Sequence, residues 1–136
     1  MAKLTFYGHS AWGLETKGTV VLMDPFLMGN PQTSVAAGDV HADFIVLTHA
    51  HFDHFGDTVA IAKRTGATLI SNLEIVNYCQ KQGVEKAHPL HIGGGNVFPF
   101  GRVKLTVAHH GSSFPDGTYG GSPAGVSSPH SSQSVG

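Results

Sequence analysis

The chain has 136 residues, a length that suits one domain. Eight lysines and arginines against nine acidic residues give a formal net charge of -1, which argues against a general nucleic-acid or membrane-surface binder. Charged residues make up only 12% of the chain, whereas 18 glycines and 10 histidines are present. Histidine is the commonest metal ligand and proton carrier near neutral pH, so its abundance needs an explanation.

The chain carries no predicted membrane span, because no run approaches the roughly 20 apolar residues that cross a bilayer. Its start also lacks the apolar stretch of a signal peptide, and one cysteine cannot form an internal disulfide. We therefore expect a cytoplasmic protein. Cys79 lies among Ile75 and Val76 in a predicted helix, where it is interpreted as a buried apolar residue.

Short apolar segments separated by turn residues predict strands in the first fifty residues. A hairpin turn at 16–18 joins two of them and suggests an antiparallel meander. A Gly/Pro/Ala-rich loop over 24–42 is long enough to indicate a binding or catalytic purpose. The predicted strands cover 4–7, 11–15, 19–23 and the continuous apolar run 44–47, which is typical of a strand buried on both faces.

Two helices are predicted next, over 57–65 and 71–82, with a short strand at 67–70 between them. Asp57 is the predicted cap of the first helix, and Ser71 begins a Ser-x-x-Glu capping box for the second. The alternation of strands and helices predicts a layered α/β fold, with helices on one face of a mixed sheet.

The last part of the chain returns to short strands, predicted at 90–92, 97–100 and 102–108, and the third of these ends at a pair of histidines. Residues 127–136 contain five serines and one aliphatic residue, which is typical of a disordered tail. The predicted organisation is therefore one domain over 1–126 followed by this tail.

A histidine cluster follows the apolar run directly. Residues two apart at a strand end point to the same side, so His49 and His51 can face one point in space, with Asp53 and His54 one turn further on. Three imidazoles and one carboxylate within six positions suit Zn²⁺ and also accept Fe, Mn or Ni. The cluster therefore predicts a site for a divalent transition metal.

The His-x-His-x-Asp-His motif after a buried strand resembles the metallo-β-lactamase superfamily. The flanking segments look like a bacterial and archaeal family of metal-dependent hydrolases similar to the ascorbate-6-phosphate lactonases, over residues 1–126. The segments that carry this likeness are Gly8-His9-Ser10-Ala11, Asp24-Pro25-Phe26, Gly29-Asn30-Pro31, residues 61–67 and residues 114–121. The resemblance implies the N-terminal half of an αββα sandwich.

The resemblance also implies the ligands of a first metal. His49 and His51 match two of them, and a histidine at the end of a later strand matches the third. His110 is preferred because it precedes the Gly-Ser-Ser-Phe-Pro-Asp segment, whereas its neighbour His109 would point to the opposite face if the strand period of two persists.

Four further residues match positions at or near a second metal. Asp53 and His54 match its ligands, while His9 and Asp24 match positions that orient ligand imidazoles or contact substrate. For His9, a hydrogen-bonded loop residue without a catalytic role is an equally good interpretation.

The implied chemistry is hydrolysis of a small-molecule ester, lactone or phosphoester. A metal held by three histidines keeps an open position and lowers the pKa of a bound water to about 7, so that hydroxide is the expected nucleophile. Asp53 is the expected catalytic carboxylate, which holds the hydroxide and accepts its proton. A nuclease acting on RNA is a further alternative, which the missing basic surplus disfavours.

The second half of the superfamily domain supplies a bridging Asp and a final His, and nothing after His110 matches them convincingly; Asp116 and His130 are the remaining candidates. We therefore expect half of a larger domain that binds one metal and retains a second weakly. The alternative is a catalytically inactive metal-binding fragment or interaction module.

A sheet built to pack against a missing partner would expose its apolar face, and a homo-oligomer is one way to cover such a face. The residues expected to be exposed are Val20, Leu22, Phe44, Val46 and Leu105.

Overall fold

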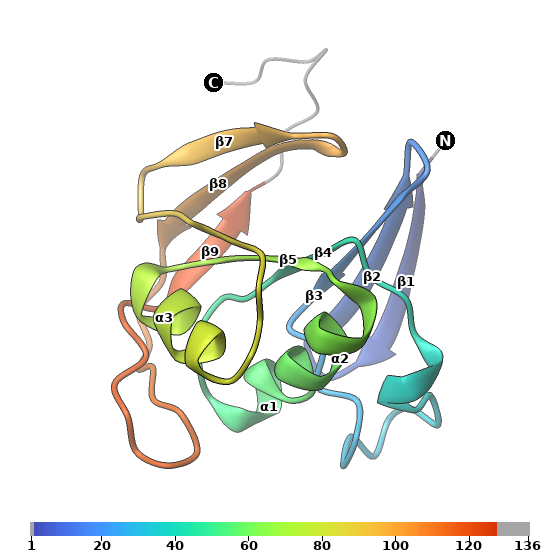
Figure 1. The fold of residues 1–136 in the computed structure, drawn as a ribbon, viewed down its shortest axis with the longest axis horizontal. Helices are drawn as coiled ribbons and strands as arrows, with labels where there is room; N and C mark the ends of the chain where they lie inside the picture. Colours follow the sequence, from blue (N-terminus) through green and yellow to red (C-terminus); the bar gives the residue numbers. More distant parts are fainter. Residues whose placement is uncertain (1, 128–136) are drawn as a thin grey trace.

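The computed structural model describes residues 2–127. Within this range two sheets and a few short helices make up the fold (Figure 1). The larger sheet has six strands in the order β1 (Lys3–Gly8), β2 (Ala11–Thr16), β3 (Thr19–Met23), β4 (Phe44–Val46), β5 (Thr68–Ser71) and β6 (Ala87–Pro89). The smaller has β7 (Gly95–Phe98), β8 (Gly101–Val107) and β9 (Ala124–Ser127), and the helices are η1 (Ala37–Asp39), α1 (Phe52–Phe55), α2 (Thr58–Thr65) and α3 (Leu73–Lys81).

The larger sheet is mixed, as predicted. Strands β1, β2 and β3 form the antiparallel meander, and β3 to β6 run parallel to one another. The turn between β2 and β3 uses Lys17 and Gly18, both with positive φ, which is the backbone form that two-residue hairpins favour. None of the helices among residues 2–127 is long and apolar enough to span a membrane.

Alternate residues of the central strands pack into two separate cores. Leu22, Ile45 and Leu69 belong to the core that α2 and α3 share with one face of the larger sheet. On the opposite face, Val21 and Ile70 pack against the smaller sheet. The predicted arrangement of helices on one face of a mixed sheet is confirmed, and the smaller sheet adds a third layer (Figure 1).

The expected exposure of the sheet face is wrong. Leu22, Val46 and Leu105 are each exposed by 2% or less, because Leu22 lies under the helices and the other two lie between the sheets. Val20 and Phe44 are half-buried. What remains exposed on this face is at the outer strand β1, where Leu4 and Phe6 are 60% and 54% exposed. A homo-oligomer stays a prediction.

One predicted helix cap is confirmed in position and the other is wrong. Asp57 is the N-cap residue of α2, as predicted, but its carboxylate makes no cap hydrogen bond and accepts from the backbone N–H groups of Leu27 and Met28, 2.8 and 2.9 Å away. Ser71 ends β5, and its hydroxyl donates to the carbonyl of Leu47. The cap of α3 is Asn72, whose side-chain oxygen accepts from the N–H of Ile75 at 2.8 Å.

The later strands are shifted from their predicted bounds. Residues 90–92 do not form a strand, because the parallel partner of β5 is β6 at Ala87–Pro89. Strand β7 begins two residues before the predicted 97–100, and β8 covers 101–107 in place of 102–108. Ser127 ends β9, while the rest of the predicted tail, including His130, lies outside the described residues.

Cys79 lies fully buried on α3, as the sequence predicted. Burial raises the pKa of its thiol to about 12, so the reactive thiolate is scarce at pH 8. We expect a disulfide reagent such as DTNB to label the folded protein at pH 8 at least ~100-fold more slowly than the protein unfolded in guanidinium. Equal labelling rates in the two states would contradict the buried position.

Candidate metal centre

The sequence-predicted site residues converge where the two sheets meet. His49 and His51 lie in the loop after β4, Asp53 and His54 lie in α1, and His110 follows β8. The backbone N–H of Ala124 in β9 donates to the carbonyl of Thr48 at 2.9 Å, which fixes the smaller sheet against the histidine loop.

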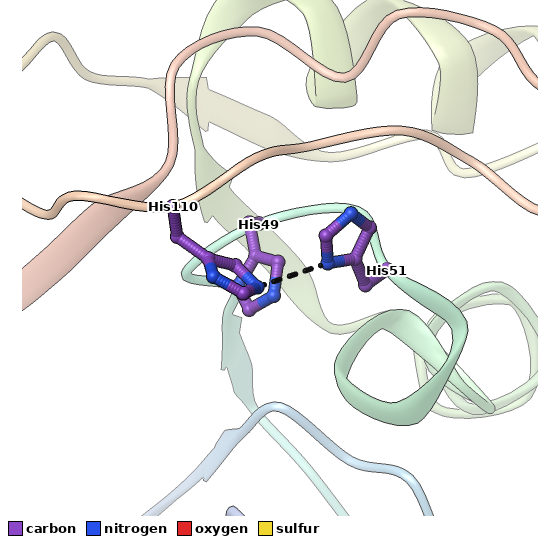
Figure 2. Close-up of side chains that lie close together, drawn as sticks. All are labelled: His49, His51 and His110. Carbon is purple, nitrogen blue, oxygen red and sulfur yellow. Dashed lines mark hydrogen bonds between the residues drawn. The ribbon is translucent and has the colours of Figure 1, made fainter.

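His49, His51 and His110 form one cluster, in which one nitrogen from each ring lies within 4.8 Å of the others. Figure 2 shows His49 and His51 on the loop after β4 facing His110 on the segment after β8. The Nδ1 atom of His51 is 3.2 Å from Nε2 of His110. Three imidazoles from two distant segments therefore face one point in space.

His49 is held in the tautomer that a metal needs. The hydroxyl of Thr48 donates to Oδ2 of Asp24 at 2.7 Å, so the same hydroxyl oxygen must accept from Nδ1–H of His49 at 2.8 Å. This leaves a lone pair on Nε2 of His49, a buried atom without a hydrogen-bond partner among the described residues. Burial, assisted by the neighbouring imidazoles, lowers the pKa of His49 to about 4, so this ring is neutral at pH 7.

Asp24 also orients His54. Its Oδ2 accepts from Nδ1 of His54 at 2.8 Å, and its Oδ1 accepts from the backbone N–H of Thr48 at 2.9 Å. This hydrogen bond raises the pKa of His54, because the carboxylate stabilises positive charge on the ring. Asp24 is 3% exposed and has a positive φ of 45°, a conformation that aspartate and asparagine tolerate better than most residues.

A second cluster lies beside the first. One ligand atom each from His9, Asp53 and His54 falls within 4.8 Å of the others. The Nε2 of His9 is 3.2 Å from Oδ2 of Asp53, and Nε2 of His54 is 3.9 Å from Oδ1 of the same carboxylate. The ring centroids of His49 and His54 are 4.1 Å apart, so the two clusters adjoin.

A close backbone approach brings α1 to Asp24. Gly56 ends α1 with a φ of 38°, and a side chain there would meet the Cα of Phe26 at 2.6 Å. Glycine at this position therefore lets the helix that carries His54 lie directly on the segment that follows Asp24.

Two further residues that support the site were missed or undervalued by the sequence reasoning. Thr48 links Asp24 to His49, and its position next to the first histidine was the available signal. Ser112 was given no role of its own, but its hydroxyl accepts from the N–H of Ala50 and donates to the carbonyl of Gly120. Ser112 thus ties the segment after His110 to the loop between His49 and His51.

Other candidates lie apart from the clusters. His109 is exposed and belongs to none of the candidate ligand groups formed by residues 2–127. Asp116 accepts from the N–H of Thr118 and lies 3.4 Å from the hydroxyl of Tyr78. Among the described residues, neither of these side chains therefore joins a metal-ligand cluster.

An open cleft of about 380 Å³ adjoins the histidines. Its volume suits a small molecule. Its wall combines the polar residues Asp24, Thr48, His49, His54 and His110 with apolar ones, among them Trp12, Met23, Pro123 and Val126.

The residues fit a divalent transition metal. A buried imidazole nitrogen without a protein partner is costly unless a ligand satisfies it, and Nε2 of His49 faces two more imidazoles. Three neutral nitrogens with room for further ligands are the donor set of catalytic zinc sites.

Comparison with known proteins gives an independent result. Residues 3–117 match the family model described as "Beta-lactamase superfamily domain". A protein of Bacillus cereus (strain ATCC 10987 / NRS 248) named "UPF0173 metal-dependent hydrolase" is 49% identical over 129 residues, which cover 91% of this chain and 56% of that protein. The chain spans about half the length of the curated relatives that it matches.

Solved structures share this fold. Igni18, described as a novel metallo hydrolase from the archaeon Ignicoccus hospitalis, superimposes with a TM-score of 0.79 and 34% identity, over 92% of this chain and 54% of that one. An isothiocyanate hydrolase from Delia radicum gut bacteria gives a TM-score of 0.68 at 22% identity, over 96% of this chain and 59% of that one. The second likeness bears on the fold alone.

Proposed function

This chain belongs to the β-lactamase superfamily domain family, and from that premise we propose that it is a metal-dependent hydrolase. The observation that carries the proposal is the cluster of His49, His51 and His110, in which Nε2 of His49 has no hydrogen-bond partner within residues 2–127. The names of the relatives as metal-dependent hydrolases support it.

His49, His51 and His110 would hold the first ion, and Asp53 with His54 would contribute to a second. When bound, such an ion supplies a water of lowered pKa and polarises a substrate oxygen. We propose zinc, because imidazole nitrogens and carboxylate oxygens are its usual ligands in sites of this kind, and Mn, Fe and Ni are the other candidates. The single buried cysteine supports a reducing compartment such as the cytoplasm.

The chain's own residues set up the reaction in two ways. Asp24 and Thr48 fix the ring orientations of His49 and His54. Asp53 is half-exposed beside His9 and His54, and its carboxylate would take a proton from the attacking water.

The cleft supports a small substrate with an apolar part. An ester, lactone or phosphoester group would react at the histidines of its wall, His49, His54 and His110. Trp12 and Val126 also line the cleft and would contact the apolar part.

The proposal is tested by metal content and hydrolysis together. Protein purified without chelator would be assayed by mass spectrometry for Zn, Mn, Fe and Ni, and then with nitrophenyl acetate, a simple lactone and bis-nitrophenyl phosphate. Hydrolysis that chelation removes and Zn²⁺ restores is the expected result. Stoichiometric metal without hydrolysis would favour the alternative of a non-catalytic metal-binding domain, and the absence of bound transition metal would contradict both.

A further inference from the structure

We propose that His9 is a metal ligand and completes a second divalent transition-metal site with Asp53 and His54. The inference rests on the proposed function, because it assigns a residue of the same centre. It differs from the sequence-based expectation, in which the missing histidine of the second site comes from a segment beyond His110 and His9 only lies nearby.

The first argument is the geometry of the donor atoms. The Nδ1 of His54 is already bonded to Asp24, so Nε2 is its free nitrogen, and this atom faces the carboxylate of Asp53. The Nε2 of His9 approaches the other oxygen of that carboxylate at 3.2 Å. Two imidazoles and one carboxylate from three positions make a known ligand set for divalent iron, zinc and manganese.

The second argument is the backbone at His9. Residues 9 and 10 form the two-residue loop between β1 and β2, with Gly8 paired to Ala11. His9 has a φ of 56°, at a loop position where glycine or asparagine is strongly preferred. His9 keeps an imidazole at this positive φ, and the ring points to Asp53. This combination indicates a functional requirement for the side chain.

The third argument is that two side chains of the long loop after β3, one of them buried, hold the loop of His9 in place. The backbone N–H of His9 donates to the side-chain carbonyl of Gln32. Asn30, 4% exposed, donates to the carbonyl of Gly8 and accepts from the N–H of Gln32. The long loop after β3 thus fixes the position of His9, as a metal ligand requires.

His41 provides a matched control. It forms an exposed histidine–carboxylate pair with Asp43 at 3.1 Å, almost the same separation as His9 and Asp53, but it belongs to none of the ligand clusters among the described residues. If His9 only formed an ion pair with Asp53, replacing His9 and replacing His41 would have the same effect on metal binding.

The test compares the wild-type chain with His9→Gly and His41→Gly by titration with Co²⁺. Glycine suits the positive φ at position 9, so His9→Gly keeps the loop, and thermal unfolding without metal checks that each variant folds. If His9→Gly does not fold, His9→Asn replaces it, because asparagine also accepts this conformation. Uptake is followed by calorimetry and visible absorption, and proton NMR follows the paramagnetically shifted imidazole N–H signals.

We expect two Co²⁺ per chain in the wild type and in His41→Gly. His9→Gly should keep the first ion at unchanged affinity, bind the second at least ~100-fold more weakly and lose one shifted N–H signal. Three results would each overturn the assignment of His9 and leave the first site standing. The wild type could bind only one Co²⁺, or His9→Gly could bind two Co²⁺ as the wild type does. The third result is that His41→Gly loses affinity for the second ion as much as His9→Gly does. A wild type that binds no Co²⁺ would overturn the proposed function itself.

Discussion

His110→Ala is expected to abolish metal binding at the first site and to reduce hydrolysis to background, whereas His109→Ala should leave both unchanged. Only His110 places an imidazole nitrogen against His49 and His51, although the two histidines are sequence neighbours. Loss of one of three ligands should weaken binding by more than the ~100-fold that loss of a supporting residue can cost.

The measurement is the Zn²⁺ or Co²⁺ affinity of both variants by calorimetry, together with hydrolysis of the best substrate. Both side chains are exposed, so neither substitution should change the free energy of unfolding much, and the pair is matched in chemistry. Equal effects of the two substitutions, or a larger effect at His109, would show that the structure selects the wrong histidine.

Asp24→Asn is expected to weaken metal binding by ~10–100-fold at both clusters, even though Asp24 need not touch a metal. Its carboxylate accepts from the Thr48 hydroxyl and from His54 at the same oxygen, and an amide cannot accept everywhere that a carboxylate does. The Thr48 hydroxyl would lose the carboxylate acceptor that makes it fix the tautomer of His49, and His54 would lose its direct acceptor. Asparagine keeps the shape and tolerates the positive φ, so backbone strain is not the cause.

Asp43→Asn is the control for Asp24→Asn. Asp43 also accepts from a backbone N–H, that of Val20 at 2.9 Å, and from a histidine, His41. We expect it to cost some stability and to leave metal affinity unchanged. If Asp24→Asn and Asp43→Asn have equal metal affinities, Asp24 does not support metal binding.

The sequence predicted those features that depend on local pattern. The continuous apolar run 44–47 predicted a strand buried on both faces, and Ile45 and Val46 do lie in separate cores. The spacing of His49 and His51 indicated that both rings share a side. Gly66 follows α2 in the left-handed conformation, which agrees with the predicted end of this helix at residue 65.

Features that depend on distant partners could not be predicted. Asp57 has the type and position of a helix cap, yet its carboxylate serves the backbone of Leu27 and Met28, some thirty residues earlier. The burial of Val46 depends on Leu105 and its neighbours in another sheet, a pairing that no local pattern specifies. Likewise, the approach of His9 to Asp53 depends on the contacts of Asn30 and Gln32.

The place of the first cluster in the fold also bears on how the molecule stays folded. His51 and His110 are 59 residues apart and come from segments attached to different sheets. An ion held by both would act as a reversible cross-link between the layers, and at 100 times its dissociation constant it would add about 2.7 kcal/mol to the stability. The melting temperature of the protein would then rise and fall with the supply of metal, so that the centre joins the two layers as well as serving the reaction.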